Sequence, residues 1–380
     1  MHCAPPSFSC NHEERLVTGK GYPFERHLVT TKDGYIIEMH RIPHGRKPCQ
    51  ELCHRTPVFL MTGLMADSTT FVLDFPEQSL GFVLPDNGYD LWLGNTRGTA
   101  FGRRHKIIGA RSRDFWNFSF HEHAIYDATA EIDYILENRK AESLLYVGLS
   151  QGTLMFFTLL SENPSYNKKI RAFAGLAPFR KLAHIRVAGL NVIKPYMRRF
   201  LVGFEHAGVL ELGHNRYPGM KAVRTICALP FRRVCAVTAD TFGNLGSKYM
   251  NISRFPVYLC YLPSGTSVKN LMHYEQLVAG KKAQKFDYGA ETNMDVYGQE
   301  EPPEYNLDNV KTDVGLFWSK GDQFIPPEDV EELVADLGER VKKAVFIDDT
   351  FYTHADFAVA LNNPTVLYGE LLEFLGRYIS

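Results

Sequence analysis

Short apolar runs that stop at a turn alternate along this chain with stretches of helical periodicity, and this alternation constrains the fold most. Runs at 58–61, 89–93 and 144–147 are each followed within two residues by a glycine. A helix-like stretch over 124–138 lies between the second run and the third. Short runs bounded by turn residues are typical of strands buried on both faces. The alternation therefore predicts a mostly parallel sheet with helices on both faces, an α/β fold.

The same rhythm returns near the C-terminus after a long interruption. We expect strands at 314–318 and 344–347, a helix over about 327–337 and a last helix that ends near Tyr378. Between 184 and 308 the chain has helix-like pieces, glycine-rich turns and few strands. The sequence thus predicts three segments, a core in two parts with a mainly helical cap inserted between them: residues 1–183, 184–308 and 309–380.

Composition and charge exclude several classes of protein. Hydrophobic residues make up 45% of the 380 residues and charged residues 22%, as in ordinary globular proteins. The formal net charge is −1, whereas a nucleic-acid-binding domain is normally strongly basic. The densest apolar run, Leu154–Leu160, is far shorter than the roughly 20 residues of a transmembrane helix. We therefore expect no nucleic-acid partner and no transmembrane segment.

The first part of the predicted insertion is basic. Residues 184–254 contain eleven Lys and Arg against three Asp and Glu, a net charge of +8. Apolar side chains are interleaved with these charges, at Ile185, Val187, Leu190, Ile193, Met197, Phe200 and Leu201. Such a segment is typical either of a cap that meets an anionic interface or of a solvated helix face on an inserted subdomain.

Gly148-Leu149-Ser150-Gln151-Gly152 matches the pattern G-x-S-x-G. The pattern alone is weak, but here a predicted strand leads in and a helical run leads out. That arrangement is the nucleophile elbow, in which a sharp turn exposes the serine hydroxyl at a helix N-terminus. Flanking glycines let strand and helix approach closely. We therefore expect Ser150 to be a nucleophile.

A serine nucleophile needs a histidine base and an acid, which follow it in the order serine, acid, histidine in this kind of fold. Of the histidines after Ser150, only His354 lies in the returning βα region; His184, His206, His214 and His273 fall in the predicted insertion. Asp322 follows the predicted strand 314–318, where the acid belongs. Asp348, Asp349 and Asp356 flank the loop of His354, and Asp329 and Asp336 fall on the following helix. We expect Asp322 as the acid and His354 as the base.

The oxyanion hole of such a site uses two backbone N–H groups, one after the nucleophile and one in the loop after an earlier strand. We expect these donors to be Gln151, which follows the nucleophile, and Leu64, which lies in the turn Thr62–Met65. No cluster has the spacing of a metal site. Cys49, Cys53 and His54 lack a second ligand pair, and His121 and His123 are interpreted as a polar helix edge. No cofactor is expected.

Seven cysteines bear on the compartment. Three pairs lie close in sequence (3 and 10, 49 and 53, 227 and 235), and Cys260 is left over. Such pairs suit disulfides in an oxidising compartment, but their connectivity does not follow from sequence. Two N-x-[ST] sequons, at Asn117 and Asn251, add little in a chain of this length. The first twenty residues contain no apolar stretch of a signal peptide, so either the chain is cytosolic or a leader is absent from this sequence.

From about Gly21 to Leu371 the chain resembles the acid lipase family of gastric and lysosomal lipases. The resemblance rests on long motifs: GYPFERHLVTTKDGYIIEMHRIPHGR (21–46), SLGFVLPDNGYDLWLGNTRGTAFGRRHK (79–106), FWNFSFHEHAIYDATAEIDYI (115–135), GLSQGT (148–153), PSGTSVKNLMHYEQLV (263–278), KFDYG (285–289) and GDQFIPPEDV (321–330). It implies an α/β-hydrolase fold with a lid in 184–308. It also implies the triad Ser150, Asp322 and His354 and the oxyanion donors Leu64 and Gln151.

The resemblance implies further features and two departures. It implies a disulfide between Cys227 and Cys235, and a secreted or lysosomal glycoprotein with a signal peptide, which is not visible here. The family usually has His-Gly where this chain has Thr62-Gly63, and Gly-His-Ser where this chain has Leu149 before the serine. Neither departure replaces the nucleophile, the base or the acid, so they bear on substrate preference and turnover.

Together these features predict a serine lipase that hydrolyses triacylglycerols or cholesteryl esters at a lipid–water interface. Two alternatives stay open. One is a lipase-like lipid carrier with little catalysis, to which Thr62 and Leu149 lend some support. The other is an esterase for small soluble esters, which shares the chemistry without the interface. The sequence does not define acyl-chain length, pH optimum or oligomeric state.

Overall fold

A mostly parallel sheet forms the centre of the computed structural model, which describes residues 13–47, 55–215, 217–228, 231–244 and 248–379. Its strands follow the order β1-β2-β4-β3-β6-β7-β10-β11, and β5 pairs with β2. The strands are β1 (Glu25–Thr30), β2 (Tyr35–Ile42), β3 (Pro57–Met61), β4 (Asp90–Leu93), β5 (Arg104–His105), β6 (Leu144–Leu149), β7 (Ile170–Leu176), β10 (Asp313–Ser319) and β11 (Val341–Ile347). From β4 to β11 all neighbours are parallel, whereas β2 is antiparallel to β1, β4 and β5. The predicted α/β architecture is confirmed.

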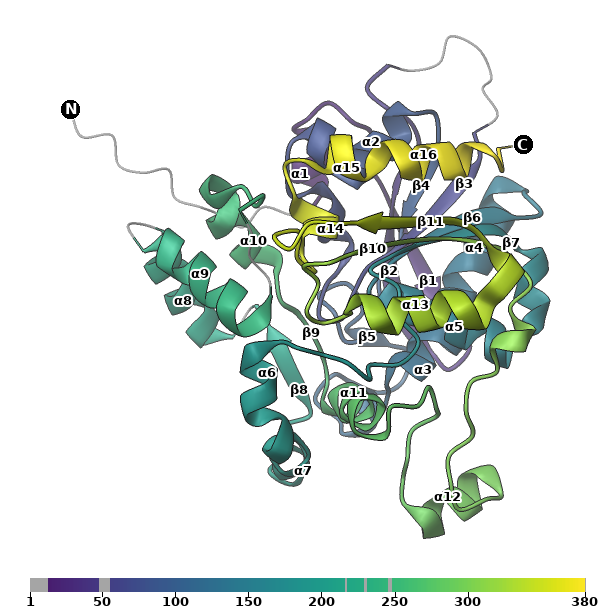
Figure 1. Ribbon diagram of the computed structural model, residues 1–380, viewed down its shortest axis with the longest axis vertical. Coiled ribbons are helices and arrows are strands. Elements are labelled where there is room, and N and C mark those ends of the chain that lie inside the picture. The colour runs from purple at the N-terminus through teal and green to yellow at the C-terminus, as the bar shows by residue number, and fades with distance from the viewer. Residues whose placement is uncertain (1–12, 48–54, 216, 229–230, 245–247, 380) are drawn as a thin grey trace.

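The central strands are buried because helices cover both faces of the sheet. Helices α2 and α16 pack on one face, and α4, α5 and α13 pack on the other (Figure 1). The helices of the core are α1 (Glu13–Thr18), α2 (Leu80–Asp86), α3 (Phe120–Glu122), α4 (Thr129–Arg139), α5 (Gln151–Glu162), α13 (Pro327–Leu337), α14 (Asp356–Val359), α15 (Asn363–Val366) and α16 (Tyr368–Gly376). Strands β3 and β6 are apolar throughout and fully buried, as a central parallel position requires.

The helix predicted over 124–138 differs from the structure at its start. Residues His123–Ala128 form a π-helical segment before α4 begins. This segment turns two polar side chains inward, His123 toward Gln151 and Asp127 toward Arg97. The apolar residues of 124–138 still recur at the spacing of an α-helix, so their periodicity does not reveal the π-helical segment.

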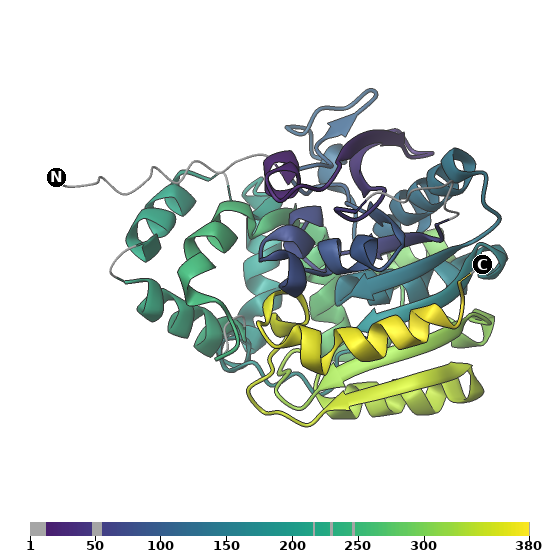
Figure 2. The same ribbon diagram turned by 90° about the horizontal axis from the view of Figure 1, so that it is seen from above.

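The segment predicted as an insertion, residues 184–308 (below called the insertion), lies between β7 and β10 of the sheet. Its elements are α6 (Ala188–Ile193), α7 (Met197–His206), β8 (Glu211–His214), α8 (Pro218–Ala228), α9 (Arg232–Gly243), α10 (Phe255–Tyr261), β9 (Ser264–Ser267), α11 (Val268–Gly280) and α12 (Ala290–Tyr297). It is mainly helical, with one antiparallel strand pair, β8 and β9. Figure 2 shows its helices α6 to α9, in teal and green, on one side of the core. No described helix has the length and apolar character that a bilayer span requires.

Candidate active site

Ser150 stands at a sharp turn between β6 and α5. Its backbone has φ 53° and ψ −115°, a strained conformation for a residue with a side chain. The glycines beside it have no room for a Cβ atom. At Gly148 a Cβ would lie 2.8 Å from the backbone of Gly152, and at Gly152 it would lie 2.5 Å from the carbonyl oxygen of Met61. The predicted elbow is therefore present, and only glycine fits at the two positions beside the serine, because the strand and the helix approach too closely for a Cβ atom.

A continuous chain of hydrogen bonds joins Ser150, His354 and Asp322. The Oγ of Ser150 lies 2.9 Å from Nε2 of His354. The Nδ1 of His354 lies 2.7 Å from Oδ2 of Asp322. The other oxygen of Asp322, Oδ1, accepts the N–H groups of Phe324 and Ile325, each at 2.9 Å. The three residues come from loops after β6, β10 and β11, and the structure brings them together.

The other carboxylates that are alternatives to Asp322 as the acid of the triad have different partners. Asp348 pairs with Lys320, Asp349 accepts the hydroxyl of Tyr249, Asp356 accepts the N–H of Thr353, Asp329 pairs with His184, and Asp336 pairs with Arg180. Only Asp322 reaches Nδ1 of His354 among these six. Its side chain is buried, so the carboxylate faces the imidazole with little competition from water.

The turn after β3 lies against the serine. A Cβ at Gly63 would lie 3.1 Å from Cβ of Ser150, so the loop that carries Leu64 passes directly beside the nucleophile. Met65 has φ 56°, and its carbonyl oxygen accepts the N–H of Ser264 at 2.6 Å. Among the described residues, the N–H groups of Leu64 and Gln151 donate no backbone hydrogen bond. Both amides are thus free to bind a developing oxyanion.

The side chain of Gln151 is held from two sides, which sequence reasoning did not find. Oε1 of Gln151 accepts Nδ2 of Asn270 at 2.9 Å, and Oδ1 of Asn270 accepts the N–H of Phe120 at 2.7 Å. This polarity leaves Nε2 of Gln151 to donate to Nδ1 of His123, at 3.2 Å. Burial, with the nearby positive charge of Arg97, lowers the pKa of His123 to about 3, so the imidazole stays neutral.

The interpretation of His121 and His123 as a polar helix edge is therefore wrong for His123. Its ring is fully buried against Phe118 and contacts Gln151. The π-helical segment accounts for this placement, because it starts at His123. A signal for Asn270 was present in the sequence, since Ser267-x-x-Asn270 begins a helix and the side chain of Ser267 caps Asn270 N–H.

A disulfide in the insertion joins Cys227 and Cys235, as the resemblance implies. Cys260 is also disulfide-bonded, so the expectation that it is the cysteine left over is wrong. Cys3, Cys10, Cys49, Cys53 and His54 lie outside the described residues. Within the described ranges, no group of three or more His, Cys, Asp and Glu side chains is arranged to hold a metal ion.

Sequence comparisons cover nearly the whole chain. A family model described as the partial α/β-hydrolase lipase region matches residues 14–75. Gastric triacylglycerol lipase of Homo sapiens is 34% identical over 99% of this chain and 94% of its own length. Lysosomal acid lipase/cholesteryl ester hydrolase of Homo sapiens is 33% identical over 98% and 92%. Lipase lipl-3 of Caenorhabditis elegans is 35% identical over 94% and 90%.

Solved structures agree in fold at much lower identity. A putative lipase from Sulfolobus solfataricus aligns with a TM-score of 0.58 and 13% identity over 90% of each chain. An alpha/beta hydrolase from Novosphingobium aromaticivorans aligns with a TM-score of 0.51 and 14% identity over 92% of this chain and 98% of the other. At such low identity these likenesses support the α/β-hydrolase fold and nothing finer.

Proposed function

The chain belongs to the acid lipase family and is a carboxylic ester hydrolase, a lipase, and from this premise we propose that Ser150, His354 and Asp322 carry its catalysis. The observation that supports the proposal is the chain of two short hydrogen bonds that ends on a strained serine. The premise rests on relatives that match nearly the whole chain, whereas the roles of single residues are our inference.

The hydrogen bonds assign a role to each residue. Because both oxygens of Asp322 already accept hydrogen bonds, Nδ1 of His354 carries a proton and Nε2 is free to accept one. His354 then takes the proton of Ser150 as Oγ attacks the ester carbonyl, and Asp322 stabilises the imidazolium that forms. The histidine returns the proton to the leaving alcohol, which departs and leaves an acyl-enzyme. A water molecule deprotonated by His354 then attacks this acyl-enzyme and releases the fatty acid.

The tetrahedral intermediates carry a negative charge on the former carbonyl oxygen. We assign its stabilisation to the N–H groups of Leu64 and Gln151, which flank Ser150 and have no other backbone acceptor among the described residues. The N-terminal end of α5 adds its positive dipole at the same point. Loss of one such donor typically lowers the rate by about 10²–10³-fold.

We further propose that the substrates are neutral lipids. We also propose that residues 1–183 and 309–380 form the core, and that the insertion between them in sequence acts as a cap over the site. The curated relatives are named for triacylglycerol and cholesteryl ester hydrolysis. In the insertion, large apolar side chains stay exposed, among them Val192 (73%), Phe200 (56%) and Val234 (62%). Such a surface suits contact with a lipid–water interface.

A secreted or lysosomal location follows from the same premise. The names of the gastric and lysosomal relatives support it, and so does the disulfide between Cys227 and Cys235. Disulfides persist in oxidising compartments and are rare in the cytosol. The sequons at Asn117 and Asn251 would then be candidates for glycosylation.

The test is release of fatty acid from emulsified trioleoylglycerol and from cholesteryl oleate, at mildly acidic and at neutral pH. We expect Ser150→Ala to fold normally and to lose activity by about 10⁴-fold or more. Ser165→Ala, at an exposed serine beyond α5, is the matched control and keeps full activity. Retention of most activity in Ser150→Ala would falsify the assignment.

Two further measurements separate the lipase from the two alternatives. A serine-reactive phosphonate probe labels Ser150 only if the hydroxyl is activated, so absence of labelling together with absence of turnover favours a lipid carrier. Labelling together with turnover of a short-chain ester that does not rise above its solubility limit favours an esterase for small esters. A jump in rate above that limit supports a lipase that acts at an interface.

A further inference from the structure

Asn244 is a buried residue at the end of a helix whose other described side chains lie mostly toward solvent. It caps α9 with φ 46° and ψ 36°, the left-handed conformation. Only 2% of its surface is exposed. Besides glycine, asparagine is the residue that adopts this conformation most readily at a helix C-terminus, and unlike glycine it brings an amide.

The amide of Asn244 reaches both loops that carry the acid and the base. Its Oδ1 accepts the N–H of Gln323 at 2.9 Å and the N–H of His354 at 3.4 Å. Its Nδ2 donates to the carbonyl oxygen of Gly321 at 3.4 Å. Gly321 and Gln323 are the residues on either side of Asp322. One side chain from the insertion thus connects the backbone around the acid to the backbone of the base.

On the side of the core, the same two loops are already packed tightly. A Cβ at Gly321 would lie 2.5 Å from the carbonyl oxygen of Tyr352, and the hydroxyl of Ser319 donates to that same oxygen at 2.8 Å. These contacts fix the loops where they leave β10 and β11. Asn244 fixes them on the opposite side, next to the carboxylate and the imidazole.

The chain after α9 is itself attached to the loop of the base. The N–H of Leu361 donates to the carbonyl oxygen of Tyr249 at 2.9 Å, and Met250 forms a β-bridge with Ala360. The hydroxyl of Tyr249 donates to Asp349. The chain that follows Asn244 is therefore attached to the core again from Tyr249 on.

We propose that Asn244 is a positioning residue for catalysis, which holds Asp322 and His354 at hydrogen-bonding distance from within the insertion. The inference rests on the proposed roles of Ser150, Asp322 and His354. It adds that the catalytic machinery is incomplete in the core alone, because one of its supports comes from the inserted segment. The amide of Asn244 contacts the backbone of the two loops, and we expect it to act through them.

Asn244→Gly tests this directly, because glycine keeps the left-handed backbone and removes only the amide. Rates are measured on a short-chain ester below its solubility limit and divided by the active sites titrated with a phosphonate. We expect kcat to fall about tenfold with KM nearly unchanged, as for a small misalignment of catalytic groups. The acid limb of the pH–rate profile moves to lower pH, because a loosened Asp322 stabilises the imidazolium of His354 less.

Asn244→Asp is the conservative partner in this test. It keeps an oxygen for the N–H groups of Gln323 and His354, loses the donor to Gly321, and adds a negative charge near the imidazolium. We expect it to retain more kcat than Asn244→Gly, and its acid limb to move to higher pH. A purely structural role predicts no shift of the limb in Asn244→Gly; the shift in Asn244→Asp comes from its added charge alone.

The control is Asn293→Ala, in α12 of the insertion. Asn293 is equally buried, but it bonds to Asp287, Tyr288 and Glu300, away from both loops. The proposal is overturned if Asn293→Ala loses as much kcat per titrated site, or if Asn244→Gly keeps the wild-type kcat and acid limb. Activity in Ser150→Ala would instead overturn the proposed function, so the two failures are distinct.

Discussion

Thr62 begins the turn Thr62–Met65, which carries the proposed oxyanion donor Leu64, and its side chain is buried. Its hydroxyl has no hydrogen-bond partner among the described residues. A buried hydroxyl without a partner loses its hydration and gains nothing in return. Thr62 is one of the two departures from the family pattern. Its unpaired hydroxyl lowers the free energy of unfolding, and a polar partner would remove this loss.

We expect Thr62→Val, which keeps the shape and removes the hydroxyl, to leave the free energy of unfolding unchanged or to raise it by about 1 kcal/mol. Urea unfolding followed by circular dichroism measures the change, with Thr153→Val as the comparison. The hydroxyl of Thr153 donates to the carbonyl oxygen of Ser150 and accepts the N–H of Phe179, so its removal destabilises. A drop for Thr62→Val as large as that for Thr153→Val would contradict this account.

Single residues also mark where sequence reasoning reached its limit. Ser150, Asp322 and His354 were identifiable because a motif, a chain order and a strand end restrict each of them. The partners of Asn244 and Asn270 could not be predicted, because the local pattern places these residues at helix ends and does not show what their amides reach. Their contacts with Gln323 and Gln151 join positions 79 and 119 residues apart. Only the packed structure reveals such partners.

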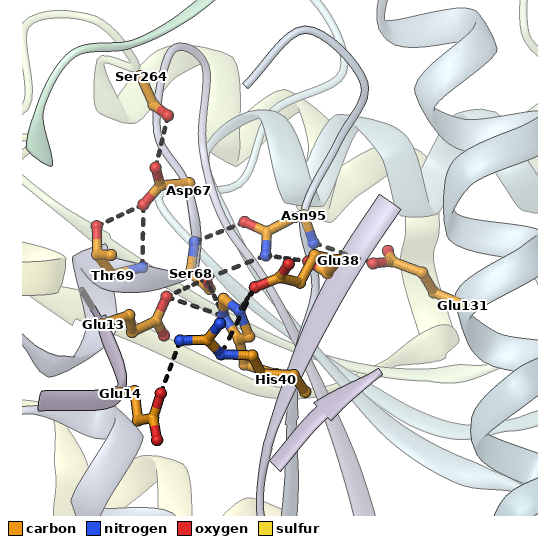
Figure 3. Close-up of polar contacts among 11 residues, drawn as sticks. Glu13, Glu14, Glu38, His40, Asp67, Ser68, Thr69, Asn95, Glu131 and Ser264 are labelled. Carbon is orange, nitrogen blue, oxygen red and sulfur yellow. Dashed lines mark hydrogen bonds and ion pairs between the residues drawn. The ribbon is translucent and has the colours of Figure 1, made fainter. Parts of the chain in front are cut away.

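At the scale of elements, α1 is joined to the sheet through a buried histidine. His40 of β2 lies 2.9 Å from the carboxylate of Glu13 in α1 and 3.0 Å from that of Glu38, and Ser68 bonds to both His40 and Glu13 (Figure 3). Burial by itself would lower the pKa of His40, but the two carboxylates outweigh it and raise the pKa to about 9.

Because the pKa of His40 is raised, the free energy of unfolding of the chain depends on pH. The folded chain holds the proton of His40 up to about pH 9, whereas the unfolded chain releases it near the ordinary value of 6.5. The stabilisation is thus fully present below pH 6.5 and is lost as the pH rises through 9. A shift of this size corresponds to about 3 kcal/mol in the free energy of unfolding.

We expect the wild type to lose stability between pH 6.5 and 9 by more than His40→Gln does, in urea unfolding at a series of pH values. Comparing the two chains removes the contribution of other groups that titrate in this range. His206→Gln, at an exposed histidine of α7, follows the wild-type curve. Parallel curves for the wild type and His40→Gln would show that His40 is not charged in the folded chain.

The elements themselves were predictable to different degrees. The buried parallel strands could be predicted, because short apolar runs bounded by turn residues are typical of such strands. The antiparallel strands β1, β2 and β5 at one end of the sheet did not stand out in the pattern, since their burial alternates or is partial. The π-helical segment before α4 was also not predicted, because the apolar residues of 124–138 recur at the spacing of an ordinary α-helix.

At the scale of the whole molecule, most of the exposed large apolar side chains among the described residues lie in the insertion. We expect the triple variant Val192→Ser, Phe200→Ser, Val234→Ser to lower turnover of emulsified trioleoylglycerol about tenfold or more, because less apolar area is available to bind the interface. Hydrolysis of a short-chain ester below its solubility limit stays at the wild-type rate.

Leu28→Ser, at an equally exposed apolar residue of β1 in the core, serves as the control and keeps both activities. Binding to lipid vesicles, measured by flotation, gives the same comparison without catalysis. Equal loss of both activities in the triple variant would mean that the substitutions disturb the site and not the attachment to lipid.

The two strands that flank the insertion lie side by side and run parallel. Strand β7 ends at Leu176 and β10 begins at Asp313, and these two strands are direct neighbours in the sheet, with Ala172 opposite Asp313. Closing a loop of twice the length costs only about 0.6 kcal/mol more, so the sheet tolerates almost any length of chain between them. The intervening segment can therefore be exchanged between relatives while the sheet keeps its register, provided that each new segment again offers an amide where Asn244 stands. Given the role that we propose for Asn244, an exchange of this segment changes substrate range and catalytic rate together.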